Sequence, residues 1–399
     1  MSFLFNNARW LGAGALLAFS SSYGQTFFIS IFADDIRAQF GLSHGEWGLI
    51  YGIGTGVSAF VMIWAGMLSD VLRVRQLAPL TLILLAMACL AMALNPFSGA
   101  LVAVVFALRF SGQGVMSHIS SVAMARWFVA SRGKALAVAT LGFAFAEAFL
   151  PMIFVGLKPV FGWKALWVLA GGMALAAIPI LLVLLRSERT PANIAQDTQS
   201  LGMGGREWTR IDAIKHPLFW CFVPSVIGMS ALLTALFFHQ IHLGEIKGWT
   251  HAEVTRLFPV YTFSSIGAML LAGVLIDRLG SARLVPVFQL PIVAGFLVFS
   301  TIESLWGGVL AMMLIGVSHG FSAPLPGAFW AEHYGTKNLG AIKSLAAAMM
   351  VLGSALGPWI TGGLIDRGVH IGDQFLGFAA FFTVTSALAA LGIRLSRAP

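Results

Sequence analysis

The sequence GLSHGE at residues 41–46 returns as GWTHAE at residues 248–253, a constant 207 residues later. The whole stretch 41–156 aligns with 248–363 at this offset without a gap. Matches between leucines would carry little weight in so apolar a chain, but scarce residues recur as well: Gly66, Asp70 and Pro151, matched by Gly273, Asp277 and Pro358. Duplicated halves in a membrane protein indicate a transporter with its site between the halves.

The composition indicates a lipid environment. Of the 399 residues, 58% are hydrophobic and 10% are charged, whereas soluble domains carry about 25% charged residues. Lipid requires every spanning backbone group to be bonded within the protein, which leaves helices or closed barrels. The apolar runs reach about 20 residues and lack the alternation of barrel strands, so they predict transmembrane helices.

Charge and cysteine content exclude other classes of protein. The net charge is +8, but no dense basic run or aromatic-interleaved patch indicates nucleic-acid binding. Cys89 and Cys221 form no CxxC motif, so neither a disulfide nor a metal site is expected. The absence of a G-x-x-x-x-G-K-[ST] motif gives no support to ATP-driven transport. We expect no cofactor.

We predict an all-α membrane protein with twelve transmembrane helices in two pseudo-symmetric six-helix bundles. An N-terminal bundle over 1–188, a cytoplasmic linker over 189–216 and a C-terminal bundle over 217–399 are expected. The spans are predicted near residues 9–33, 45–69, 76–95, 99–124, 134–157, 164–186, 217–243, 252–276, 284–302, 305–331, 339–365 and 374–395.

The distribution of basic residues predicts the orientation. With both termini inside, 17 of the 24 Lys and Arg residues fall on the inner side and six on the outer side, and Arg109 lies within a span. This excess predicts an inner-membrane protein with both termini in the cytoplasm. Two capping boxes, Ser43-x-x-Glu46 and Thr250-x-x-Glu253, are predicted to open the second helix of each half.

A charged motif follows the second span of each half at its cytoplasmic end. The first copy contains Gly66, Asp70, Arg73 and Arg75, and the second contains Gly273, Asp277, Arg278 and Arg283. A carboxylate at a helix end can pair with a cation or with a facing helix N-terminus. Such a cluster can hold one conformation shut, so we predict a conformational gate.

These paired motifs, the twelve spans and the central linker resemble the major facilitator superfamily over nearly the whole chain. The family pattern is Gly-x-x-x-Asp-(Arg/Lys)-x-Gly-(Arg/Lys)-(Arg/Lys), from which Val71 and Arg73 depart. The resemblance implies secondary transport by alternating access, with spans 1, 4, 7 and 10 around a central cavity. A gating role for Asp70 is likewise implied by the resemblance.

Arg109 is the leading candidate for substrate binding. It lies about ten residues into span 4, where a charged residue costs roughly 2.5–3.5 kcal/mol on insertion scales. That cost is tolerable where the guanidinium meets a wet cavity, a carboxylate or an anionic ligand. At 100° per residue, Gln113 and Ser120 fall on the same helix face. Arg109-Phe110-Ser111-Gly112-Gln113-Gly114 also resembles the span-4 Arg-x-x-x-Gly signature of the superfamily.

Glu147, near the middle of span 5, is the expected partner of Arg109. A proton or a substrate that competes for this pairing would couple transport to protons. A purely structural Arg–Glu pair is the alternative.

Further candidates lie in spans 1 and 10. Span 1 carries the polar run 20–26, in which Tyr23 and Gln25 are candidate ligand contacts because the resemblance places span 1 at the cavity. Hydrogen bonding between helices is the competing explanation. His319 in span 10 matches Gly112 in the repeat and could bind substrate, carry a proton or simply pack.

Three functions compete. We predict a secondary transporter for a small organic anion of monocarboxylate type, coupled to protons and working as a monomer, since span 4 resembles the monocarboxylate and oxalate/formate branch. Span 8 lacks a mid-helix Asp/Arg pair and span 1 lacks a lysine, which departs from that branch. A drug–proton antiporter is the alternative. The G-x-S-x-G pattern at 316–320 would indicate a hydrolase only in a strand–turn–helix context, and here it lies in an apolar helix.

Overall fold

The computed structural model describes residues 2–66, 68–128, 132–187, 201–335 and 337–396. Within these ranges all regular elements are helices. The chain divides into an N-terminal unit, Met1–Gln196, and a C-terminal unit, Asp197–Pro399. Both units consist of helices because in lipid a backbone N–H or C=O group finds a partner only within the protein.

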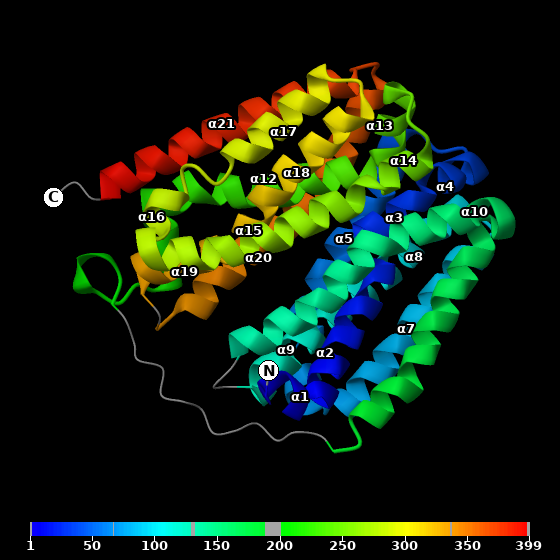
Figure 1. The fold of residues 1–399 in the computed structure, drawn as a ribbon, viewed down its shortest axis with the longest axis horizontal. Helices are drawn as coiled ribbons and strands as arrows, with labels where there is room; N and C mark the ends of the chain where they lie inside the picture. The colour runs from blue at the N-terminus through cyan, green and yellow to red at the C-terminus, as the bar shows by residue number, and fades with distance from the viewer. Residues whose placement is uncertain (1, 67, 129–131, 188–200, 336, 397–399) are drawn as a thin grey trace. The chain divides into compact units, whose positions relative to one another are not determined.

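The N-terminal unit packs its helices around a core that includes Leu82, Leu108 and Trp167. The long helix α10 lies against α2 and α7, as Figure 1 shows, and α5 lies against α8. Its elements are α1 (Ser2–Asn6), α2 (Ala8–Ser20), η1 (Ser21–Gly24), α3 (Thr26–Ile29), η2 (Ser30–Phe32), α4 (Ala33–Phe40), α5 (His44–Ala65), α6 (Leu68–Val71), α7 (Val74–Leu94), η3 (Ser98–Ala100), α8 (Leu101–Leu108), η4 (Arg109–Met116), α9 (Ser117–Trp127) and α10 (Arg132–Leu184).

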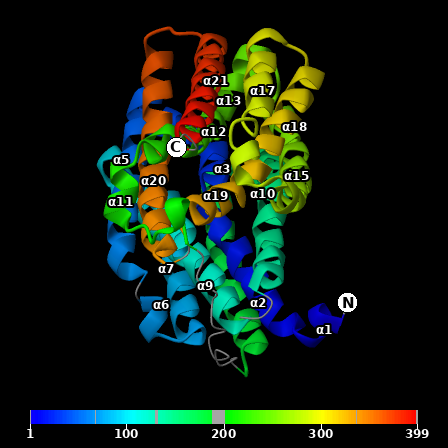
Figure 2. The same ribbon diagram turned by 90° about the vertical axis from the view of Figure 1, so that its left-hand side faces the viewer.

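The C-terminal unit pairs α15 with α18, α12 with α20, and α17 with both α18 and α21. Figure 2 shows α17 and α18 side by side. Its elements are η6 (Met203–Gly205), α11 (Arg210–Lys215), α12 (Pro217–Phe238), α13 (Gln240–Lys247), α14 (His251–Thr255), α15 (Leu257–Leu279), α16 (Ser281–Leu284), α17 (Leu290–Thr301), α18 (Leu305–Ser322), α19 (Leu325–Tyr334), α20 (Leu339–Asp366) and α21 (Ile371–Ser396).

Among the described residues, nine helices are long and apolar enough to cross a membrane, or ten if the bent pair Ala8–Gly24 and Thr26–Phe40 forms one span. The predicted spans 134–157 and 164–186 both lie within α10, whose two helical stretches are interrupted at Gly162, where φ is 72° and ψ is 158°. The ninth predicted span contributes only the short apolar helix Leu290–Thr301. Pro286 and Pro291 shorten it, because proline cannot donate a helical hydrogen bond. The multi-pass character is clear, and the count of twelve stays a prediction.

Both predicted capping boxes are confirmed. The Ser43 hydroxyl accepts from the Glu46 N–H and the Glu46 carboxylate accepts from the Ser43 N–H. Thr250 and Glu253 make the same reciprocal contacts. These bonds satisfy backbone N–H groups that the first helical turn leaves without partners.

Part of the predicted linker 189–216 lies outside the described residues, and its remainder packs on the C-terminal unit. We call residues 201–216 the docked segment. Its Trp208 carbonyl accepts from the Asn338 amide at 2.9 Å, and Lys337 pairs with Glu207. The Trp208 ring meets Tyr334 edge to face. This segment therefore belongs structurally to the C-terminal unit.

Candidate functional site

Arg109 is 1% exposed and lies at the start of η4, a π-helical segment of span 4. Its Nη1 donates to the Gly24 carbonyl at 3.0 Å. Its guanidinium carbon lies 5.2 Å from the centre of the Tyr51 ring. A carbonyl dipole and an aromatic face both favour a cation, so these two contacts offset part of the cost of burying this charge.

The Gly24 carbonyl is available because span 1 breaks there. Gln25 has extended backbone angles of φ −88° and ψ 155° between η1 and α3. Phe28 N–H, which would bond Gly24 in a continuous α-helix, donates to the Gln25 carbonyl at 3.2 Å instead. Broken helices supply such free carbonyls at membrane depth only where the protein surrounds them.

Two glycines allow the broken span 1 to touch the π segment. A Cβ on Gly24 would lie 2.1 Å from the Leu108 carbonyl oxygen and 2.8 Å from the Gly112 Cα. A Cβ on Gly112 would lie 2.6 Å from the Gly24 Cα. Only glycine fits at both places, so this crossing brings the Gly24 carbonyl within reach of Arg109.

Tyr51 and Thr26 support the Arg109 side chain. Tyr51, from α5, is fully buried, and its hydroxyl hydrogen-bonds the Thr26 hydroxyl at 2.5 Å. Thr26 begins α3 directly after the break in span 1. Neither residue was predicted from the sequence as a member of the site. The scarcity of tyrosine, with four in the chain, was the signal that could have pointed to Tyr51.

Arg109 keeps one edge unpaired. Its Nε and Nη2 are buried and have no hydrogen-bond partner among the described residues. These two nitrogens carry the parallel N–H groups of one guanidinium edge, the fork that binds a carboxylate through two hydrogen bonds. The third nitrogen is the one that Gly24 occupies. This edge has the donor geometry that suits a planar oxyanion.

Predicted site residues in spans 1 and 4 fall into two groups. Gln25 and Gln113 flank the crossing, are half-buried and form no side-chain hydrogen bond among the described residues. Tyr23 lies elsewhere, since its hydroxyl approaches the Met173 sulfur at 3.7 Å and its ring packs on Phe28. The structure therefore places Tyr23 in an aromatic cluster away from Arg109.

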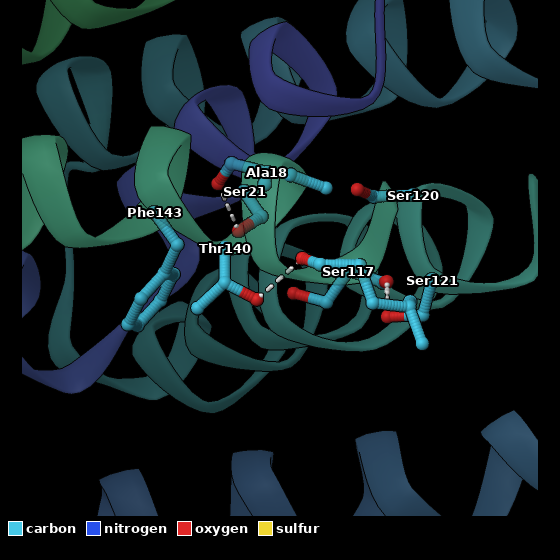
Figure 3. A pocket seen from close by; sticks show the side chains of 9 residues that line it. Ala18, Ser21, Ser117, Ser120, Ser121, Thr140 and Phe143 are labelled. Atoms are coloured by element: carbon cyan, nitrogen blue, oxygen red, sulfur yellow. Dashed lines mark hydrogen bonds between the residues drawn. The ribbon is translucent and has the colours of Figure 1, made fainter. Parts of the chain in front are cut away.

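Ser120 lines a cavity of about 160 Å³ between span 1, α9 and α10, drawn in Figure 3. Its hydroxyl donates to the Gly14 carbonyl at 2.8 Å. Three more hydroxyls at the cavity donate to carbonyls three or four residues earlier in the chain: Ser21, Ser121 and Thr140. Their protons are engaged, so these four hydroxyls turn mainly acceptor oxygens toward the cavity.

The structure does not join Arg109 to Glu147. Glu147 is buried in α10 at 8% exposure, but Arg109 forms no ion pair among the described residues and contacts Gly24 and Tyr51 instead. The expected pairing came from sequence position alone. Sequence position does not show that the break in span 1 places the Gly24 carbonyl beside the guanidinium.

His319 lies in α18 of the C-terminal unit. Its Nδ1 lies 2.7 Å from the Tyr261 hydroxyl and 3.2 Å from the Ser265 hydroxyl, both on α15. Ser318, the serine of the G-x-S-x-G pattern, lies in the same helix as His319. Its hydroxyl accepts from the Ile292 N–H of α17 at 2.9 Å. Ser318 therefore caps α17 and lacks the strand–turn context of a nucleophile.

The predicted gate is described in part. Gly66 ends α5, and its carbonyl accepts from the Ser69 hydroxyl at 2.8 Å. The side chain of Asp70 lies outside the described residues. The remaining charged members are exposed and form no ion pair among the described residues: Arg73, Arg75, Asp277, Arg278 and Arg283. A Cβ on Gly273 would meet no atom within 4 Å, so nothing within its own unit requires a glycine there.

Two contacts that were not predicted from the sequence hold the loops after spans 2 and 8. In the N-terminal unit, Arg126 from α9 donates to the Ser69 carbonyl at 2.7 Å. In the C-terminal unit, the Glu332 carboxylate from α19 accepts from the Ser281 N–H at 3.1 Å and from the Ser281 hydroxyl at 2.5 Å. Each contact joins a residue near the end of span 4 or 10 to the loop after span 2 or 8. Neither pair obeys the repeat, so the offset could not reveal them.

Comparison with known proteins agrees with this fold. The Major Facilitator Superfamily profile matches residues 14–358 and 218–398. A bacterial homologue of the human lysosomal transporter Spinster, in an inward-facing and unoccupied conformation, is 16% identical, with 97% of each chain covered and a TM-score of 0.73. The nucleoside transporter NupG is 15% identical over 98% of this chain and 100% of its own, with a TM-score of 0.69.

At such identities the structural likenesses show the fold alone. No curated protein shows significant similarity to the chain. The profile, by contrast, covers well over half of the sequence and both halves of the repeat. The chain therefore belongs to the major facilitator superfamily, a family of membrane transporters.

Proposed function

We propose that the protein is a secondary transporter that moves a small organic anion of monocarboxylate type across the inner membrane. Arg109 holds the carboxylate, and protons drive transport through Glu147. The unpaired Nε and Nη2 edge of Arg109 carries the proposal. A fixed, planar fork of two donors matches a carboxylate better than any neutral group.

The energetics favour an anion at this place. A buried guanidinium with two unpaired donors is costly, because each unsatisfied buried donor costs about 1–3 kcal/mol. The Gly24 carbonyl accepts a hydrogen bond from Nη1 of Arg109. The Tyr51 ring packs near the guanidinium group. A ligand carboxylate would satisfy both remaining donors and neutralise the charge. Binding thus offsets part of the cost of burying these two donors.

Neighbouring amides extend the site. Gln25 follows the break in span 1, and Gln113 lies within the π segment of span 4. Each side chain is half-buried and can donate or accept. In this proposal both amides bind polar groups of the acid other than its carboxylate. Ser120 and the hydroxyl-lined cavity beside η1 bind water or further polar groups.

Glu147 is the proposed proton-coupling residue. It is 8% exposed within α10, and we assign the coupling proton to this buried acidic group. Arg109 contacts other groups in this conformation. In this proposal Glu147 exchanges the proton and Arg109 binds the substrate carboxylate. Glu147→Gln should abolish gradient-driven uptake but retain exchange of acid across the membrane.

Uptake into proteoliposomes under an inward proton gradient tests the proposal. Small carboxylates form the panel, and neutral nucleosides serve as a comparison because one structural neighbour transports nucleosides. Wild type should accumulate an acid. Arg109→Gln should lose at least 100-fold in uptake efficiency, because two hydrogen bonds to a charged group are worth about 3 kcal/mol or more.

Arg109→Lys is the matched variant, since it keeps the charge and loses the fork. It should recover only a small part of the lost uptake. Full activity in Arg109→Lys would show that charge alone suffices and would contradict the bidentate site. If a correctly folded wild type accumulates no acid, the organic-anion proposal falls, and resistance assays in a pump-deficient host would then test drug efflux.

A further inference from the structure

A shallow apolar groove lies on the outside of the N-terminal unit, near the end of α10. It has a volume of about 330 Å³ and is lined by Pro179, Ile180, Val183 and Leu184. Ile180 and Val183 are 53% and 52% exposed. In a bilayer such a surface is covered by lipid chains or by another apolar surface, so the groove needs an occupant of that chemistry.

Two arginines lie at the charged end of this groove. At 100° per residue, Pro179, Val183 and Arg186 fall within about 60° of one another on the helix, so Arg186 follows the groove on the same face. The Trp10 Nε1–H donates to the Ser187 carbonyl at 2.9 Å and joins the start of α2 to the end of α10. Arg9 and Arg186 are each one residue away from this bond.

Both arginines are free to bind an anion. Arg9 and Arg186 are exposed, and neither forms an ion pair within the part of the chain that the structure describes. The guanidinium fork matches the oxygens of a phosphate group. Two cations beside an apolar groove therefore complement the two parts of a phospholipid, its negative phosphate and its acyl chain.

Helix α1 indicates that this end of the groove lies at the depth of the lipid headgroups. Leu4 and Phe5 of α1 are 45% and 77% exposed. Asn7, with φ −118° and ψ 11°, separates α1 from α2, and Figure 2 shows α1 turned away from the axis of α2. A helix that crosses the end of a span and exposes apolar side chains is typical of the membrane–water interface.

We propose that Arg9, Arg186 and this groove form a binding site for an anionic phospholipid. The phosphate lies between the two guanidinium groups, and one acyl chain follows residues 179–184. A zwitterionic lipid carries its own cation beside the phosphate, so it binds less tightly. The site lies wholly within the N-terminal unit and goes beyond transport, because it involves neither Arg109 nor the transported molecule.

Native mass spectrometry of the purified full-length protein tests the headgroup part of the proposal. Phosphatidylglycerol and phosphatidylcholine with the same acyl chains are the two probes. Because each arginine strengthens binding to an anionic lipid about fivefold, the first phosphatidylglycerol should bind about 25-fold more tightly than phosphatidylcholine. Arg9→Gln and Arg186→Gln should each reduce this preference about fivefold, and the double variant should have almost none.

The matched control is Arg394→Gln. Arg394 is exposed near the end of α21, one residue beyond the repeat counterpart of Arg186, so its substitution removes a cation at the matching end of the C-terminal unit. It should leave the preference unchanged. The single variants keep the test decisive even if the double variant is poorly folded, as its thermal midpoint would show.

A second pair of variants tests the groove. Val183→Trp fills the groove and keeps both arginines, so phosphatidylglycerol should bind about tenfold more weakly. Val384→Trp, at a 57% exposed position of α21, is the control and should bind as wild type does. Glycerol 3-phosphate, which has the phosphate without acyl chains, should not displace the lipid at equal concentration.

Three results would overturn the proposal. Equal binding of the two lipids by wild type would show that this face meets lipid without a headgroup site. An undiminished preference in both single arginine variants would place the anionic lipid elsewhere. Unaltered binding by Val183→Trp, or displacement of the lipid by glycerol 3-phosphate, would show that the arginines bind a phosphate group without help from the groove.

Discussion

The two units hold their central polar side chains by different means. In the N-terminal unit, Arg109 depends on a broken span 1 and a π-helical span 4, whose contact at Gly24 and Gly112 exposes a backbone carbonyl. In the C-terminal unit, α18 is a regular helix, and His319 contacts the Tyr261 and Ser265 hydroxyls and stacks on the Tyr261 ring. A permanent cation in an apolar span needs a strong acceptor, which side-chain hydroxyls do not replace. An imidazole is not a permanent cation, and His319 is held without an irregular helix.

The largest effect is expected at the crossing of the two irregular helices. In Gly24→Ala the new Cβ would clash with the Leu108 carbonyl, so spans 1 and 4 must separate. Overpacking of this kind costs about 1–3 kcal/mol or more, and the shift would also remove the carbonyl from Arg109. We expect at least a 100-fold loss of uptake together with a lower thermal midpoint.

Gly56→Ala is the matched control, because its Cβ would meet nothing within 4 Å. It should fold and transport normally. Gly320→Ala, which would place a Cβ 2.2 Å from the Ser265 carbonyl oxygen, should destabilise the C-terminal unit without abolishing binding at Arg109. Full transport by Gly24→Ala would refute the dependence of Arg109 on the broken helix.

A smaller effect on uptake is expected from substitutions of Tyr51. Tyr51→Phe keeps the ring near Arg109 and loses the hydroxyl bond to Thr26, so uptake should fall no more than about threefold. Tyr51→Leu also removes the aromatic face, and a cation–π contact is worth about 0.5–2 kcal/mol. We expect a further fivefold loss, measured as KM in proteoliposomes. Equal losses in both variants would show that the hydroxyl, and not the ring, supports the cation.

The sequence was sufficient for the helical class, the duplication and both capping boxes, since these depend on composition, a fixed offset and local hydrogen bonds. It was also sufficient to single out Arg109, because a charge inside an apolar run has few explanations. The sequence did not predict the partners of Arg109. Tyr51 lies 58 residues away on another helix, and the Gly24 carbonyl is a backbone group without a sequence signature.

The helix irregularities explain the remaining differences. A period of 3.6 residues assumes continuous α-helix, but Arg109–Met116 is π-helical, which changes the rotation between residues at that place. The offset of 207 residues likewise predicts equivalent contacts. Arg126 and Glu332 hold corresponding loops through opposite charges at unmatched positions, so the duplication preserved the helices but not the side chains that join them.

These two loop contacts provide a third test of the comparison. Glu332→Gln removes the charge that favours the Ser281 N–H at the start of α16, and we expect a loss of about 1 kcal/mol. This should lower the thermal midpoint by about 2–4 °C for a unit of this size. Arg126→Gln should act on the N-terminal unit by a similar amount. If only one variant has an effect, the two loops are not held by equivalent contacts.

The smallest effect concerns His216 of the docked segment, a second histidine with a different environment from His319. Its Nδ1 accepts from the Leu218 N–H at 3.3 Å, and its ring meets Trp208 edge to face. Burial first, and the nearby Arg206 second, lower the pKa of His216. The folded state therefore binds its proton less readily than the unfolded state does, so the stabilisation is complete above about pH 6.5 and is lost as the pH falls below it.

Hydrogen exchange over residues 201–216 checks this, with rates at pH 5.5 and 7.5 corrected for intrinsic chemistry. The segment should be less protected at pH 5.5 in wild type and equally protected at both values in His216→Asn, which keeps a capping acceptor and does not titrate. An unchanged pH response in His216→Asn would assign the effect to another group. The variant also sharpens the uptake assay, because any acid dependence that survives in it cannot come from His216 and remains available to Glu147.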